Sequence, residues 1–295
     1  MNWITLKYTV NSIPNPEHMK VHLIYFSPGG TTRKTVRNIA KGISGQIKDC
    51  EILEHDMLDR FNRQRKLEFG KEDLVILGMM TLVQPFGPIK EIFEAIKGND
   101  TPLVGVVMFG NGMYGNSLKI IKRQVEKRGF DMIAAGAFIG QMTYDFRVGA
   151  NRPDEGDMKK QHEFGRKIGQ KLQKGAKLIL EAKLKTDWPK HFNFHTIKTA
   201  LMIYAPLGKL KVPKPFNSLK FTEDCISCGK CEKRCPLGAI DLSKKLSDQK
   251  ICIGCLACVN GCSQNGIVYT NKLMKKAAED CIQFFRERRE PELFY

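Results

Sequence analysis

Cysteine spacing carries the clearest chemical signal in this sequence. Eight of the ten cysteines lie between Cys225 and Cys262, in two copies of the pattern CxxCxxCxxxC at residues 225–240 and 252–267, each closed by an isoleucine five residues later. Such crowding indicates metal ligation in a reducing compartment rather than a disulfide framework. Two-residue gaps let three thiolates point into one cavity and hold three corners of a [4Fe-4S] cubane. Cys50 and Cys281 stand alone, and we expect them to be structural.

Zinc is the alternative metal for cysteines at these spacings. Structural zinc sites use paired CxxC segments that supply four thiolates to one tetrahedral ion. Three cysteines at strict two-residue gaps, twice over, would be an unusual way to build such a site. The repeat therefore predicts two [4Fe-4S] clusters and, with them, electron transfer.

Residues 221 to about 270 resemble a bacterial two-cluster ferredoxin. The resemblance rests on the cysteine repeat and on Pro236, which follows the fourth cysteine of the first repeat. Ser263 stands where that family usually has a second proline. In such ferredoxins the fourth cysteine of each repeat ligates the other cluster. The resemblance implies one cluster on Cys225, Cys228, Cys231 and Cys262, and the other on Cys252, Cys255, Cys258 and Cys235.

A second candidate site follows the first strongly apolar segment. The run Ser27-Pro28-Gly29-Gly30-Thr31-Thr32 leads from a predicted strand into a predicted helix, and it offers hydroxyls, backbone amides and a helix N-terminus to a phosphate. Two further loops, 79–88 and 109–115, follow later strands. Open parallel sheets bind ligands outside the carboxyl ends of their strands, so we expect the three loops to share one edge.

The elements that position these loops alternate along residues 20 to about 183. Apolar runs predict buried strands, and apolar residues at helical spacing predict helices between and after them. This alternation is typical of a parallel sheet covered on both faces. The predicted strands are 21–26, 74–77, 103–109 and 132–139, with a weaker edge strand at 51–53, and the predicted helical faces are 36–43, 89–96 and 158–179.

These residues resemble flavodoxins, which hold FMN between three such loops. The resemblance implies an α/β fold, a doubly wound parallel sheet of order 2-1-3-4-5, followed here by a small α+β two-cluster ferredoxin domain. It assigns the phosphate to Ser27, Gly29, Gly30, Thr31 and Thr32. It places the flavin ring beside Thr81 and Leu82 on one side, and Gly110, Asn111, Gly112 and Tyr114 on the other.

The whole chain is similar to the flavodoxin-ferredoxin fusion family of anaerobic bacteria and archaea. We predict an N-terminal extension with a possible edge strand at residues 1–19, an FMN domain at 20–183, and a basic proline-containing connector at 184–220. The two-cluster domain would span residues 221–271, and a C-terminal helix and tail 272–295.

Composition and motifs limit the function further. The chain has no long apolar run and no signal-peptide pattern, so we expect a cytoplasmic protein without a membrane span. The net charge of +17 favours an acidic redox partner protein. No catalytic residues and no oligomeric state are predicted, and we expect an electron carrier or one/two-electron converter with FMN and two clusters. The alternatives are an FMN-dependent reductase of a small molecule and, less favoured, a nucleic-acid-binding protein with structural clusters.

Overall fold

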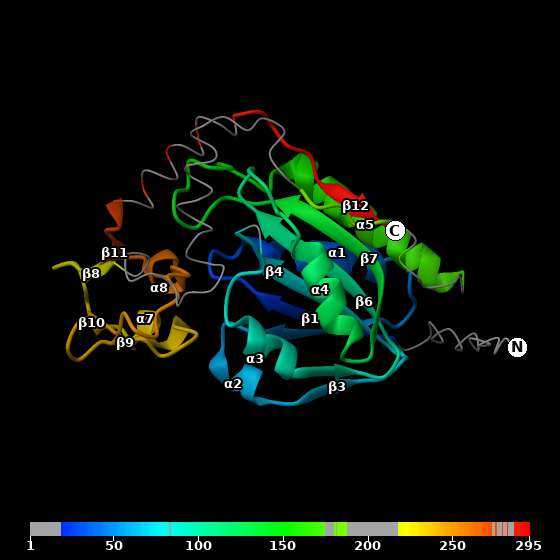
Figure 1. The fold of residues 1–295 in the computed structure, drawn as a ribbon, viewed down its shortest axis with the longest axis horizontal. Helices are drawn as coiled ribbons and strands as arrows, with labels where there is room; N and C mark the ends of the chain where they lie inside the picture. The colour runs from blue at the N-terminus through cyan, green and yellow to red at the C-terminus, as the bar shows by residue number, and fades with distance from the viewer. Residues whose placement is uncertain are drawn as a thin grey trace, which may run out of the picture.

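The computed structural model describes residues 19–82, 84–174, 180, 182–187, 218–272, 275, 279, 282 and 286–295. A central sheet organises the larger part of the chain (Figure 1). Among the described residues its strands lie in the order β12-β7-β6-β4-β1-β2. The strands are β1 (Lys20–Phe26), β2 (Glu51–Asp56), β4 (Asp73–Met80), β6 (Thr101–Phe109), β7 (Phe130–Ile139) and β12 (Glu292–Phe294).

The sheet has the flavodoxin-like order that the sequence predicted. β2, β1, β4, β6 and β7 pair in parallel, which is the order 2-1-3-4-5 along the chain. All nine residues of β6 are buried, as expected for a strand covered on both faces that comes from a continuous apolar run. The carboxyl ends of the five parallel strands therefore form one edge of the sheet, which we call the rim.

Helices cover both faces of the sheet. Ile39 of α1 (Thr31–Ser44) and Phe164 of α5 (Glu155–Gln173) pack on one face. Phe93 of α3 (Ile89–Glu94) and Ile121 of α4 (Ser117–Glu126) pack on the other. The short helix α2 (Arg60–Gln64) and the parallel pair β3 (Leu67–Phe69) and β5 (Ile96–Gly98) lie beside this core.

Residues 218–272, which we call the cysteine-rich part, contain short elements only. Two antiparallel pairs, β8 with β11 and β9 with β10, frame two small helices. Figure 1 shows this part beside the rim of the sheet. Its elements are β8 (Leu219–Phe221), α7 (Lys230–Arg234), β9 (Ile240–Asp241), β10 (Leu246–Ser247), α8 (Ala257–Asn260) and β11 (Ile267–Tyr269).

The C-terminal segment returns to the sheet, which the sequence did not predict. β12 pairs antiparallel with β7, and Phe294 is buried in the core. Ile96 also differs from its prediction: α3 ends at Glu94, and Ile96 pairs with Leu67 in the β5–β3 pair instead of continuing the helix.

Three other predictions concern residues beyond the described ranges. The edge strand expected within residues 1–19 and most of the connector lie outside the described residues, as does most of the C-terminal helix that was expected to carry Cys281. In the part of the chain that is described, no helix combines the length and the apolar character needed to cross a membrane.

Candidate cofactor sites

Two cavities in the cysteine-rich part are each lined by four cysteines. The first, of about 380 Å³, is lined by Cys225, Cys228, Cys231 and Cys262. The second, of about 330 Å³, is lined by Cys235, Cys252, Cys255 and Cys258. Each cavity thus receives three cysteines from one repeat and the fourth from the other, which is the crossed grouping implied by the ferredoxin resemblance.

The chemistry of the cysteine side chains fits an iron-sulfur cluster. A cubane is held at its corners by thiolates around a cavity, and backbone amides commonly donate to the sulfurs. Here Ala239 N donates to Cys235 Sγ at 3.1 Å, and Gly254 N donates to Cys252 Sγ at 3.4 Å. Within the described ranges, no group of three or more His, Cys, Asp or Glu side chains converges closely enough to hold a single metal ion.

The two cavities differ in their exposure to solvent. Cys228 of the first set is exposed, and the neighbouring Ile226 side chain is 66% exposed. In the second set, Cys255 and Cys258 are buried, and burial raises the pKa of the Cys255 thiol to about 12. Only the first set has an exposed cysteine, whereas the second set has two buried cysteines and two half-buried ones, Cys235 and Cys252.

A third cavity, of about 430 Å³, lies at the rim of the parallel sheet. Four loops line it, one after each of β1, β4, β6 and β7. Of the residues predicted to bind FMN, this rim cavity is lined by Gly29, Thr31, Thr32, Thr81, Leu82 and Gly110. These six are fewer than half of the fifteen residues that line the cavity.

The phosphate loop at the rim has the features of an anion cradle. Gly30 has φ +85°, a left-handed conformation that favours glycine, and directly precedes α1. Ser27 does not line the cavity, because its hydroxyl accepts a hydrogen bond from Arg33 N at 3.0 Å and caps the first turn. A Cβ atom on Gly29 would lie 2.7 Å from Thr143 Cγ2, so a larger residue would close the cradle.

The loop after β4 is held in a fixed conformation. The Thr81 hydroxyl donates to Gln84 O at 2.8 Å and forms a second hydrogen bond with the Ser117 hydroxyl. Leu82 N donates to Gln84 O at 3.0 Å. The Leu82 side chain is therefore presented beside the rim cavity, where the resemblance placed it.

Three residues after β6 lie away from the rim cavity. The Tyr114 side chain is fully buried, packs 5.5 Å from the Phe109 ring, and donates from its hydroxyl to Glu292 Oε2 at 2.9 Å. Asn111 Nδ2 donates to Glu287 O, and Asn111 Oδ1 accepts from Arg289 N. This geometry does not support the predicted places of Tyr114 and Asn111 beside the flavin ring, because both side chains bind the C-terminal segment.

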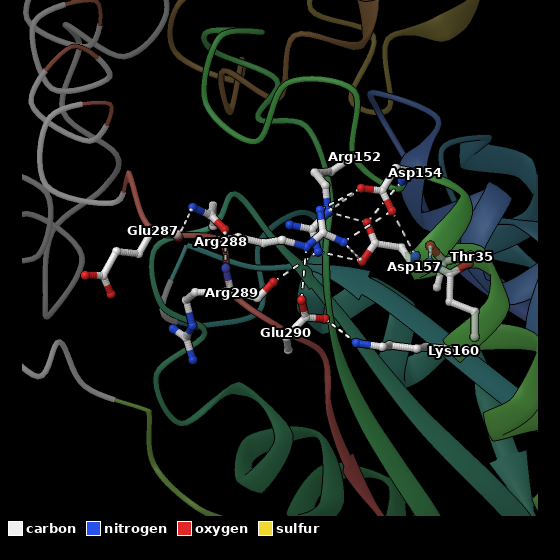
Figure 2. Close-up of polar contacts among 11 residues, drawn as sticks. Thr35, Arg152, Asp154, Asp157, Lys160, Glu287, Arg288, Arg289 and Glu290 are labelled. Atoms are coloured by element: carbon white, nitrogen blue, oxygen red, sulfur yellow. Dashed lines mark hydrogen bonds and ion pairs between the residues drawn. The ribbon is translucent and has the colours of Figure 1, made fainter.

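Gly112 has the same neighbour: its carbonyl accepts a hydrogen bond from the Arg289 guanidinium. Figure 2 shows the adjoining network, in which Arg152 pairs with Asp157 and the Arg288 side chain reaches Asp154. The C-terminal segment thereby supports the loop after β6 from outside the cavity.

The loop after β7 was missed by the sequence analysis. Gly140, Gln141, Met142, Thr143 and Tyr144 all line the rim cavity. The missed signal was the strand itself: a fifth parallel strand, predicted at 132–139, must also end at the rim, so the residues that follow it belong to the site.

Comparison with known proteins bears on the cysteine-rich part. Residues 220–241, which include the first repeat, match the family described as "4Fe-4S binding domain". Pyruvate synthase subunit PorD of Methanocaldococcus jannaschii is 32% identical over 78 residues, which are 24% of this chain and 91% of PorD. The cysteine-rich part belongs to the 4Fe-4S binding domain family. We call it the 4Fe-4S domain below.

Other relatives match only in part. The putative electron transport protein YccM of Escherichia coli is 36% identical over 75 residues, covering 25% of this chain and 20% of YccM. The chain thus covers a third or less of the length of the first relatives it matches. For two further relatives the covered share of their length is 32% and 17%. A solved flavodoxin from the domain Archaea covers 52% of this chain and 99% of its own, at 15% identity and a TM-score of 0.38.

The 4Fe-4S domain contacts the rim through Leu256. This residue lines the second cysteine cavity, is 3% exposed, and packs with Tyr144 and Tyr269, with Leu82 and Met142 against them. Tyr144, Leu82 and Met142 also line the rim cavity. Leu256 therefore belongs both to the lining of the second cysteine cavity and to the cluster that contains the wall of the rim cavity.

Proposed function

We propose that this protein transfers electrons between an FMN bound at the rim and two [4Fe-4S] clusters held by the crossed cysteine sets. FMN exchanges one or two electrons and a [4Fe-4S] cluster exchanges one, so their combination would make a carrier that converts between the two. The observation that carries the proposal is Leu256, which lines the second cysteine cavity and packs in one cluster with Tyr144 of the rim cavity.

The two cysteine sets and the rim residues would have different roles in this transfer. The second cysteine set would hold the cluster nearer the flavin, enclosed by protein at the rim contact. The first set, with exposed Cys228, would hold the cluster that exchanges electrons with other proteins. Thr31, Thr32 and the first turn of α1 would bind the phosphate, and Thr81 and Leu82 would bound the ring.

The partner that suits the exposed face is an acidic redox protein. Ile226 offers an apolar contact at the first cysteine cavity, and Lys230 lines the same cavity. An apolar contact beside a lysine, on a chain of net charge +17, favours a partner with a complementary negative patch. Its association should weaken as salt is raised, because exposed charges are then screened.

Anaerobic preparation followed by iron, sulfide and flavin analysis tests the cofactor content. We expect about eight irons and one FMN per chain. Zinc in place of iron would contradict the electron-transfer proposal, and eight irons without flavin would leave only the cluster half of it.

Kinetics then test transfer within one molecule. After partial reduction by a light pulse, flavin and cluster spectra should relax together at a rate independent of protein concentration. Leu256→Ala should retain its iron and slow this relaxation, whereas Leu246→Ala, at an exposed residue on β10, should not. A rate proportional to protein concentration would show that electrons pass between molecules instead.

A further inference from the structure

Two side chains of the 4Fe-4S domain reach the loop at residues 27–32 of the rim. Arg234 ends α7 immediately before Cys235, and Asn260 ends α8 between Cys258 and Cys262. Neither is a thiol, so neither is needed as a cluster ligand. Their contacts are instead with the loop that the proposed function assigns to the flavin phosphate.

Asn260 brings an unsatisfied donor to this loop. Its Nδ2 atom is buried and has no hydrogen-bond partner among the described residues. A Cβ atom on Gly29 would lie 4.0 Å from this nitrogen. Near the same Cβ position of Gly29 lies Thr143, whose hydroxyl is also buried and unpartnered within the described ranges. Buried donors without an acceptor are costly, so two of them beside one glycine indicate a polar ligand at that point.

Arg234 brings a positive charge to the same loop. Its Nη2 donates to Pro28 O at 3.3 Å, and its Nε donates to Ala257 O at 3.1 Å. In the described part of the chain, both hydrogen bonds of this guanidinium go to carbonyl oxygens and none to a carboxylate. No ion pair joins it to a described carboxylate, although the charge of Arg234 acts on the nearby Asp56 carboxylate and lowers its pKa against the effect of burial. Pro28 itself lines the rim cavity.

We infer that Asn260 and Arg234 complete the phosphate site, so that the flavin is held by both parts of the chain. The α1 N-terminus, the Thr31 hydroxyl and the loop amides would bind the phosphate from the sheet side. The Asn260 amide and the Arg234 guanidinium would bind it from the 4Fe-4S domain. A neutral ribityl or ring group could accept the hydrogen bond from Asn260, but it would not pair with the charge of Arg234. The phosphate is the part of FMN that suits both side chains.

The inference rests on the proposed FMN site and adds a consequence. Because Arg234 and Asn260 are neighbours of cluster cysteines in sequence, the geometry of the loaded clusters would set the geometry of the phosphate site. Flavin binding and cluster assembly would then be thermodynamically linked, since each stabilises the same arrangement.

Comparison of FMN with riboflavin tests the inference, because the two differ only in the phosphate. Flavin-free, cluster-loaded protein is titrated with each compound under anaerobic conditions, and binding is followed by flavin fluorescence. Asn260→Ala and Arg234→Gln should each raise the FMN dissociation constant about ten-fold. Asn260→Asp should raise it further, because it sets a negative charge against the phosphate. Riboflavin binding should change less than about two-fold in all three.

Lys233→Gln is the matched control, since it removes an exposed lysine next to Arg234 and should leave both dissociation constants unchanged. Iron content equal to wild type in every variant shows that the fold is retained. If wild type binds FMN but the three variants bind it equally well, or lose FMN and riboflavin in parallel, the inference is wrong while the FMN site stands. If wild type binds no FMN, the proposed function fails and this inference with it.

Discussion

The crossed grouping of cysteines is open to a decisive test with pairs of substitutions. Cys228 and Cys262 come from different repeats and line the same cavity. Cys228 and Cys235 come from the same repeat and line different cavities. Replacing the first pair by alanine removes half the thiols of one cavity and leaves the other complete. Replacing the second pair removes one thiol from each cavity.

The expected iron contents follow from these cavities. Each has four cysteines, so each complete set should hold one cubane of four irons. Cys228→Ala with Cys262→Ala should therefore retain about four irons that resist a chelator as well as those of wild type. Cys228→Ala with Cys235→Ala should retain no complete set, and its iron should be lost on the same treatment. Cys50→Ala, outside both cavities, should retain about eight.

Iron and sulfide analysis before and after anaerobic gel filtration with chelator provides the measurement. EPR of the reduced samples then tells whether a surviving cluster is intact. The reasoning is refuted if the same-repeat pair keeps one resistant cluster while the cross-repeat pair keeps none. In that case each repeat would hold its own cluster.

Three further predictions concern the flavodoxin-like part. Arg289→Ala, which removes the guanidinium from Gly112 O and from its place 5.0 Å over the Phe109 ring, should weaken FMN and riboflavin binding alike, by about three-fold in fluorescence titration. Asp157→Ala should lower the free energy of unfolding in urea by about 3–5 kcal/mol, since Arg152 loses its buried partner, against about 1 kcal/mol for the cap variant Asp154→Ala. Burial lowers the pKa of His22 and His55 below 6.5, so the unfolded chain takes up protons first as the pH drops, and the free energy of unfolding should fall below that pH. The midpoint of urea unfolding measures this fall, which His55→Gln should make smaller.

Sequence patterns predicted those parts of the fold that depend on local composition. Four of the five parallel strands come from apolar runs, and the edge strand β2 has only a weak pattern. The strand order follows from the flavodoxin resemblance and from the constraints on parallel sheets. β12 escaped prediction because only three residues form it, Glu292–Phe294, and they adopt a strand through pairing with β7 rather than through their own pattern. Ile96 was misplaced because an isoleucine at helical spacing also suits a short buried strand.

In the candidate sites, too, local patterns predicted some features, whereas others depend on contacts between distant segments. The ferredoxin resemblance implied the two sets of cysteines, and the members of each set line one cavity. Tyr114 was assigned to the ring because the loop position fitted, but its hydroxyl has a partner, Glu292, 178 residues later in the chain. Asn260 carried no recognisable motif, and its importance depends on how two parts of the chain dock. Contacts between distant segments are what a single sequence does not display.

A comparison of the two repeats in the structure supports the docking. Leu256 and Gly229 occupy the same position in the two repeats, with φ of +59° and +77°. Glycine adopts this left-handed conformation freely, whereas a leucine there costs about 1–2 kcal/mol. Without the rim residues Tyr144, Leu82 and Met142, the leucine would be strained and would keep only the neighbours of its own domain, Tyr269 among them. Against Tyr144 it is 3% exposed, and burying a leucine contributes about 1.5–3 kcal/mol, enough to offset the strain. The second repeat is therefore built to pack on the rim, and the first, with glycine at this position and Cys228 exposed, to face outward.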